Sequence, residues 1–328
     1  MTKVRFTKDG QKALDFILAR WAPIMRPRRQ ARIERIISLL MTERGVKQAD
    51  QPLVLEATRM VVNKGFEPFL HMLEDPAGYA RRRRAQYNDL DGYYKRPYIV
   101  TRWPSTATKP AKPPSQMKVL AVCGSPRRHG NTDVLIDEAL RACQDAGAAT
   151  EKIFLQSLNL KFCISCRKCK EPGWEGWCTI KDDMSQIYPK IEACDAMIVG
   201  YPIYTGRESA QMSTFFDRLD CLRGHLGQRL KPGRRAMVIA TWGYPYTDTY
   251  DHSVEQVITW LNLHRIEPVE ALTACGFSGL LHGWDENHKA IILRHPEEME
   301  KVYRAAWRMI TGEELKGKSS PNRKTARR

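Results

Sequence analysis

Four cysteines lie within sixteen residues near the middle of the chain, in the spacing C-x2-C-x2-C-x8-C. Thiolates this close in sequence can converge on one metal centre, and two successive x2 gaps are typical of iron–sulfur ligand loops. Zinc sites built from four cysteines more often consist of two separated C-x2-C pairs. The spacing therefore favours a cluster, and a zinc ion or unmetallated thiols are the alternatives. The candidate ligands are Cys163, Cys166, Cys169 and Cys178.

The composition is that of a globular protein in a reducing compartment. The chain has 328 residues, of which 42% are hydrophobic and 27% charged, so it has room for two domains. No apolar run approaches the roughly 20 residues that a membrane span needs, and the polar start lacks the apolar segment of a secretory signal. The chain has nine cysteines and no predicted secretory signal, which favours a cytoplasmic location, where thiols stay reduced. Five of them lack ligand spacing and are interpreted as packing residues, namely Cys123, Cys143, Cys194, Cys221 and Cys275.

Charge and residue pattern divide the chain into four parts. Residues 1–102 are rich in basic residues and have hydrophobic positions at helical spacing, which predicts a basic helical domain. Residues 103–116 contain four prolines among small polar residues and predict a linker. Residues 117–314 have 24 basic and 26 acidic residues and predict the main domain. The remaining 315–328 have six basic residues and no acidic one, which predicts a disordered tail.

The net charge of +16 therefore comes from the two ends of the chain. Runs of like charge more often form a solvated face than a binding site, so nucleic acid is not the expected partner. Within the helical domain, helices are expected over 8–20 and 33–41. Asp50 is expected to cap a third helix, with Pro52 in its first turn.

After the proline-rich stretch, short apolar runs alternate with amphipathic helices, which predicts a parallel sheet. Five strands are the number in a flavodoxin-like sheet, in which helices cover both faces. The predicted fold class is therefore α/β, a flavodoxin-like five-stranded parallel sheet preceded by a small all-α domain. The strands are expected over 119–122, 152–155, 196–200, 235–240 and 269–274, and the helices between them over 132–146, 183–193, 209–222 and 253–263.

The turn G-S-P-R-R-H-G-N-T lies between the first predicted strand and the helix after it. In an open α/β sheet this turn is at the carboxyl end of a strand, where ligands bind. Small residues such as Gly130 let backbone N–H groups approach a phosphate, and Ser125, Asn131 and Thr132 add side-chain donors. Arg127 adds positive charge, and the helix directs its positive end at the anion. The turn is therefore a candidate phosphate site, although it is neither a P-loop nor G-x-G-x-x-G.

Three motifs together resemble the NAD(P)H-dependent FMN reductase group of flavodoxin-like proteins. The turn described above is similar to the phosphate loop of that group. The stretch G-Y-P-I-Y-T-G, followed by M-S-T-F-F-D-R, is similar to its flavin turn and the next helix. This resemblance implies flavin contacts at Pro202, Ile203, Tyr204, Thr205 and Gly206. The third motif follows the fourth strand and implies a second wall of the flavin pocket from Thr241, Trp242 and Gly243. For Trp242, packing in the core is the alternative.

With the cysteine run included, residues 117–280 resemble the iron–sulfur flavoprotein branch of this family. The resemblance implies FMN and a [4Fe–4S] cluster held by the four cysteines. It also implies a homodimer or homotetramer in which the cluster loop lies near the flavin of a neighbouring subunit. The chain departs from the pattern in its long x8 gap, which contains Trp174 and Trp177 and puts the role of Cys178 in question. Residues 22–34 are weakly similar to the small helical domain of the light-independent protochlorophyllide reductase B subunit, and no function is transferred through them.

Three functions are consistent with these patterns. The leading hypothesis is a flavin-dependent oxidoreductase that transfers electrons between the cluster and FMN, coupling a one-electron donor such as ferredoxin to a two-electron acceptor. No acid–base pair stands out, so no catalytic residue is assigned. The second hypothesis is a cluster-free NAD(P)H-dependent FMN or quinone reductase. The third is a redox-responsive module that binds nucleic acid or an acidic protein.

Overall fold

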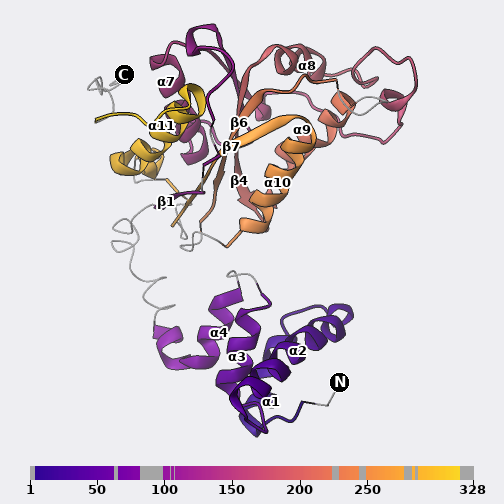
Figure 1. The fold of residues 1–328 in the computed structure, drawn as a ribbon, viewed down its shortest axis with the longest axis vertical. Coiled ribbons are helices and arrows are strands. Elements are labelled where there is room, and N and C mark those ends of the chain that lie inside the picture. The colour runs from indigo at the N-terminus through magenta and orange to yellow at the C-terminus, as the bar shows by residue number, and fades with distance from the viewer. Residues whose placement is uncertain are drawn as a thin grey trace. The chain divides into compact units, whose positions relative to one another are not determined.

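The computed structural model describes residues 4–62, 66–81, 99–103, 105–106, 108–223, 229–243, 249–276, 283–284 and 287–317. The chain forms two units, Met1–Gly92 and Tyr93–Arg328 (Figure 1). No helix in the described ranges is both long enough and apolar enough to cross a membrane.

The first unit is helical and has a hydrophobic core of its own. Its helices are α1 (Lys8–Leu18), α2 (Arg26–Arg44), α3 (Gln51–Arg59) and α4 (Glu67–Glu74). The carboxylate of Asp50 accepts a hydrogen bond from the backbone N–H of Leu53 at 3.0 Å, which confirms the predicted cap of α3. Gly45 ends α2 with a φ of 65°, a left-handed conformation that glycine adopts without strain. The helix α4 was not predicted.

The second unit contains the parallel sheet that the sequence predicts. Its five parallel strands are β2 (Lys118–Cys123), β3 (Ala149–Phe154), β4 (Ala196–Tyr204), β6 (Arg234–Thr241) and β7 (Ile266–Cys275). They are arranged side by side as β3-β2-β4-β6-β7. This is the flavodoxin-like order, in which the chain reverses direction across the sheet beside β2 and places a ligand site there. The predicted fold class is confirmed.

Two further strands extend the sheet beyond the prediction. Strand β1 (Ile99–Arg102) pairs antiparallel with β7 at one edge. Strand β5 (Arg207–Glu208) forms a short hairpin with the end of β4. Because β1 belongs to the sheet, the helical unit ends before it, whereas the sequence placed the domain boundary after residue 102. An edge strand exposes unpaired backbone groups, and β1 covers those of β7 by pairing with it. The residues of β1 therefore belong to the α/β unit rather than to the helical unit.

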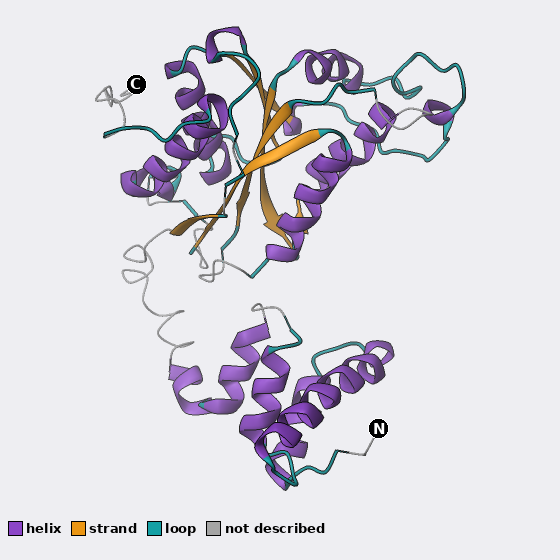
Figure 2. Ribbon diagram, viewed as in Figure 1, coloured by secondary structure: helices purple, strands orange, loops and turns teal. Residues whose placement is uncertain are grey.

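Helices cover both faces of the sheet (Figure 2). One face carries α7 (Asn131–Asp145) and α11 (Pro296–Thr311), and their apolar residues share one core. The other face carries α8 (Met184–Ala193), α9 (Ala210–Leu219) and α10 (Asp251–Leu263), which share a second core. The helix α11 was not predicted, although Val302, Ala306 and Met309 repeat at helical spacing and are fully buried.

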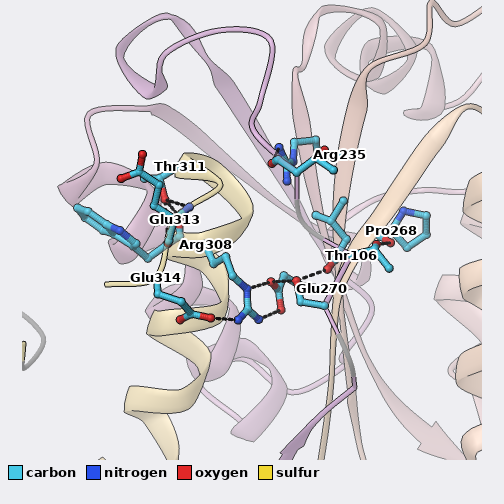
Figure 3. Close-up of polar contacts among 12 residues, drawn as sticks. Thr106, Arg235, Pro268, Glu270, Arg308, Thr311, Glu313 and Glu314 are labelled. Carbon is cyan, nitrogen blue, oxygen red and sulfur yellow. Dashed lines mark hydrogen bonds and ion pairs between the residues drawn. The ribbon is translucent and has the colours of Figure 1, made fainter. Parts of the chain in front are cut away.

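The proline-rich stretch after β1 is fastened to the sheet. The N–H of Trp103 donates to the carbonyl of Ala271 at 3.0 Å, and the hydroxyl of Ser105 donates to the Glu270 carboxylate at 2.7 Å. Glu270 lies on β7 with 2% of its surface exposed, and the guanidinium of Arg308 binds it at 2.5 and 2.8 Å (Figure 3). A buried carboxylate requires such donors. The predicted linker therefore packs on the sheet, and most of the predicted tail, residues 318–328, lies outside the described residues.

Candidate functional site

A cavity of about 220 Å³ opens at the carboxyl ends of β2, β4 and β6, where a flavodoxin-like sheet binds its ligand. It brings together eleven of the thirteen residues predicted to contact the cofactor. The other two, Thr205 and Gly206, form the turn between β4 and β5, with φ of 50° and 89°. The cavity is lined by Ser125, Arg127, Gly130, Asn131, Thr132, Pro202, Ile203, Tyr204, Thr241, Trp242 and Gly243, and also by Gly283 and Trp284.

The turn after β2 presents the start of α7 to this cavity. The residue that precedes the helix, Gly130, has no side chain to cap it. The turn is held by its own contacts, since Ser125 Oγ accepts from the N–H of Arg127 at 3.1 Å and Asp133 accepts from the N–H of His129 at 2.7 Å. Asp133 in turn forms an ion pair with Lys152 at 2.8 Å. A helix start without a side-chain cap suits a phosphate, which would accept from its backbone N–H groups.

The side chain of Asn131 makes two contacts that the sequence did not predict. Its side-chain amide donates to the carbonyl of Gly283 at 3.0 Å, and its side-chain oxygen accepts from the N–H of Ile292 at 3.1 Å. The side chain therefore fixes the segment that brings Trp284 to the cavity wall. Gly283 has a φ of 86°, and a Cβ there would lie 2.4 Å from the Asn131 amide nitrogen. Sequence reasoning missed Gly283 and Trp284 because no local motif marks them.

We expect Asn131→Ala to weaken the cavity wall and the cofactor affinity together. The substitution leaves two backbone groups without their partners, at a cost of about 1–3 kcal/mol. If half of this free-energy loss weakens FMN binding, the dissociation constant of FMN rises about two- to tenfold. Fluorescence titration of the flavin measures this. Gln144→Ala removes an exposed hydrogen bond to Thr150 at the other end of α7 and should bind FMN like the wild type. Equal affinity of both variants would contradict the assigned role of Asn131.

The opposite wall of the cavity is built from the ends of β4 and β6. The hydroxyls of Thr132 and Thr241 form a buried hydrogen bond of 2.7 Å that joins α7 to β6. Trp242 is 6% exposed and packs edge-on against Tyr250 at 5.5 Å, so it lines the cavity and belongs to the core at once. Tyr204 stands at the cavity mouth with 41% of its surface exposed. Burial of part of its ring raises the pKa of the phenol above its ordinary value.

The four candidate metal ligands lie on the loop between β3 and α8. Cys163 and Cys166 are exposed, and Cys169 and Cys178 are half-buried against the core of the α8 face. All are free thiols, but within the described part of the chain no three His, Cys, Asp or Glu side chains lie close enough together to hold a metal ion. The five other cysteines are buried, in agreement with the packing interpretation.

The backbone of this loop nevertheless suits anionic sulfur ligands. Ser165 and Arg167 adopt left-handed conformations, with φ of 51° and 62°, on either side of Cys166. Such turns point successive N–H groups to one side, as in many phosphate and iron–sulfur sites. The backbone N–H of Lys168 and the hydroxyl of Thr179 bond to the Cys166 sulfur and lower the pKa of its thiol. The donor chemistry of the loop therefore fits a thiolate-bound group.

Residues 170–177, the long gap before Cys178, are held in place by side-chain contacts. Arg229 donates to the carbonyls of Trp174 at 2.5 Å, Glu175 at 3.1 Å and Gly176 at 2.6 Å. The indole N–H of Trp174 donates to the carbonyl of Trp177 at 3.2 Å. Trp177 in turn packs on Tyr188 of α8, with ring centroids 5.6 Å apart. These contacts anchor the gap and hold Cys178 against the core.

The strand order and the helix start at the cavity define the class of the second unit, a flavodoxin-like α/β domain. Residues 117–275 match the sequence profile of the NADPH-dependent FMN reductase family. An iron–sulfur flavoprotein of Methanocaldococcus jannaschii is 42% identical over 150 residues, which are 46% of this chain and 74% of that protein. An iron–sulfur flavoprotein of Methanosarcina thermophila is 30% identical over 187 residues, 57% of this chain and 87% of that protein.

The chain belongs to the iron–sulfur flavoprotein branch of the NAD(P)H-dependent FMN reductase family, and it is a flavin-dependent oxidoreductase. Among solved structures, an FMN-dependent NADH-azoreductase of Bacillus anthracis in complex with FMN covers 59% of this chain and all of its own length. It is 16% identical, with a TM-score of 0.42. The part of the chain that matches the family profile, residues 117–275, lies within the second unit.

Proposed function

We propose that the chain transfers electrons between a [4Fe–4S] cluster and FMN, and that it couples a one-electron donor such as ferredoxin to a two-electron acceptor. FMN accepts one or two electrons, whereas a cluster passes them singly. The observation that carries the proposal is that one sheet holds both the cavity, with its phosphate turn, and the loop with four free thiols.

Different groups of residues at the cavity are suited to bind different parts of FMN. The uncapped start of α7 would bind the phosphate through backbone N–H groups, and Arg127 would add positive charge beside it. Pro202, Ile203 and Tyr204 would lie along the flavin ring, and Thr241, Trp242 and Gly243 would form the facing wall. Thr205 and Gly206 would shape the turn that carries Tyr204 to the mouth.

Two features of the cysteine loop support the proposal, namely the spacing of its four cysteines and the exposed apolar side chains beside them. Cys163, Cys166, Cys169 and Cys178 would supply the four thiolates, in the spacing typical of such loops. Phe162 and Ile164 beside them are 73% and 71% exposed. Apolar side chains so exposed fit a contact with a second copy of the chain, as in a homodimer or homotetramer. Free thiols on an exposed loop also suit a reducing compartment such as the cytoplasm.

Analysis of the protein purified without oxygen tests this proposal. We expect one FMN per chain together with iron and acid-labile sulfide in equal amounts, and a visible spectrum that contains bands of both groups. Reduced ferredoxin should bleach the flavin, and replacement of the four cysteines by serine should abolish that transfer while FMN stays bound. Size-exclusion chromatography measures the oligomeric state.

The main alternative is a cluster-free reductase that takes hydride from NAD(P)H. It is favoured by the match to NADPH-dependent FMN reductases and by the exposed positions of Cys163 and Cys166. A protein with bound FMN, no acid-labile sulfide and fast bleaching by NADPH would establish this alternative and overturn the electron-relay proposal.

A further inference from the structure

The cysteine loop is closed at its two ends by one buried ion pair. Arg218 of α9 binds the carboxylate of Asp182 with both terminal nitrogens, at 2.5 and 3.0 Å. The two side chains have no exposed surface. Parallel bonds between a guanidinium and a carboxylate fix both distance and orientation. This pair therefore joins the start of α8, which follows the loop, rigidly to α9.

The same pair also holds the backbone on both sides of the loop. Arg218 donates to the carbonyl of Lys161 at 2.7 Å and to that of Ile180 at 3.4 Å. Asp182 accepts from the N–H of Lys161 at 2.8 Å, so the two polar backbone groups of Lys161 are both bound to the pair. Asn159 and Asp183 add a second pair of bonds just outside this point, at 2.8 and 3.3 Å. The loop that carries the four cysteines thus begins and ends at one place.

The ion pair is stable in its charged form. Burial alone would raise the pKa of Asp182, but the hydrogen bonds from Arg218 and from the Lys161 N–H outweigh burial and hold the pKa below its usual range. The carbonyl of Arg218 is bound as well, since it accepts from the hydroxyl of Tyr188 at 3.1 Å and from the thiol of Cys221 at 3.3 Å. Both the side chain and the backbone of Arg218 are therefore fixed.

The helix that carries Arg218 begins beside Gly124, the residue before Ser125 of the cavity wall. Ser209 caps α9, and its hydroxyl donates to the carbonyl of Gly124 at 2.5 Å, next to the phosphate turn. A Cβ on Gly124 would lie 2.8 Å from Met212 of α9, so the helix and the turn are in close contact. The ten residues of α9 span about 15 Å, with the contact to Gly124 at the start of the helix and the contact of Arg218 to the cysteine loop near its end.

We propose that Arg218, through its pair with Asp182, is the positioning residue of the cysteine loop. It holds the two ends of the loop together and fixes them, by way of α9, relative to the flavin cavity. Joining the ends removes much of the conformational freedom of the segment between them, so the thiols start from a limited set of arrangements when they bind a metal centre. This inference rests on the proposed cluster for its consequence, but the closure of the loop can be measured without any metal.

The substitution Arg218→Lys tests the inference because it keeps the charge and removes the planar fork. In metal-free protein, trypsin should cleave the loop after Arg167 and Lys168 about tenfold faster than in the wild type, since the loop ends open more often. In protein purified without oxygen, iron and acid-labile sulfide per FMN should fall about fivefold or more, while the FMN content stays at one per chain.

Arg308→Lys is the matched control. Arg308 is also buried and bound by two bonds to a carboxylate, but its partner Glu270 lies on β7, away from the loop. The same exchange there should leave both cleavage of the loop and iron content unchanged. Asp182→Asn should reproduce the effects of Arg218→Lys, because it weakens the same pair from the other side.

Wild-type cleavage and iron content in Arg218→Lys would overturn the inference. Loss of FMN from that variant together with faster unfolding of the whole unit would also overturn it, because Arg218 would then be a general core residue. A wild-type protein that lacks sulfide would instead refute the proposed function, and the cleavage comparison would still decide the role of Arg218.

Discussion

Replacement of Arg308 by methionine is expected to lower the free energy of unfolding of the α/β unit by about 3–5 kcal/mol. The substitution leaves the Glu270 carboxylate on β7 without the guanidinium that binds it, at a position with 2% exposure. Methionine fills similar volume, so the loss comes from the uncompensated charge rather than from a cavity. The same pair ties α11 and the segment after β1 to the edge of the sheet (Figure 3).

Hydrogen exchange of β7 and α11 measures this loss without a contribution from the helical unit. Arg304→Met is the control on the same helix, since Arg304 pairs with Glu300 in a partly exposed bridge and should cost less than about 1 kcal/mol. The double variant Glu270→Met, Arg308→Met should recover a large part of the loss, because it removes both charges. A single variant as stable as Arg304→Met would mean that the pair adds nothing to the fold.

The parts of the fold that the sequence predicted are those specified by local pattern. Strands β2, β4 and β6 contain continuous buried apolar runs, and the helices between the strands have one apolar face, so these elements are visible within a short window. The position of Ser125 and Thr132 at the cavity could be predicted for a similar reason, because a parallel sheet places such turns at one edge. The role of the four cysteines as ligands was predicted from their spacing and stays a prediction.

The parts that were missed depend on contacts between distant segments. Asn131 was predicted to donate to a phosphate, and the sequence could not show that its side chain also binds a segment about 150 residues further along the chain. That contact helps to place Trp284 at the cavity wall. Residues 103 and 105 were assigned to a linker because their neighbours are prolines and small polar residues. The composition could not show that Ser105 donates to the buried carboxylate of Glu270, which is far away in the sequence. Spacing likewise could not show that Arg229 would anchor the long gap before Cys178.

Cys178 follows that gap and is the candidate fourth ligand of the proposed cluster. Cys178 and Cys221 both belong to the core of the α8 face, but their sulfurs are held differently. The thiol of Cys221 is 3% exposed and donates to the carbonyl of Arg218 at 3.3 Å. Cys178 is half-buried at the end of the loop, and the contacts of Trp174 and Trp177 hold it there. Of these two cysteines, Cys178 is the one that combines access with the loop spacing.

We therefore expect Cys178→Ser to reduce iron and acid-labile sulfide per FMN to less than about half of the wild-type values, because serine is a poor ligand for a soft metal centre. Cys221→Ser should keep the wild-type content, and both variants should bind FMN equally well because neither cysteine lines the cavity. Iron and sulfide analysis of the two proteins, purified side by side without oxygen, makes the comparison. The reverse pattern would assign the fourth ligand to Cys221 and would require the loop to rearrange, since the Cys221 thiol would have to leave the Arg218 carbonyl. Cluster contents near the wild-type level in both variants would show that Cys163, Cys166 and Cys169 suffice, with a ligand from outside the loop.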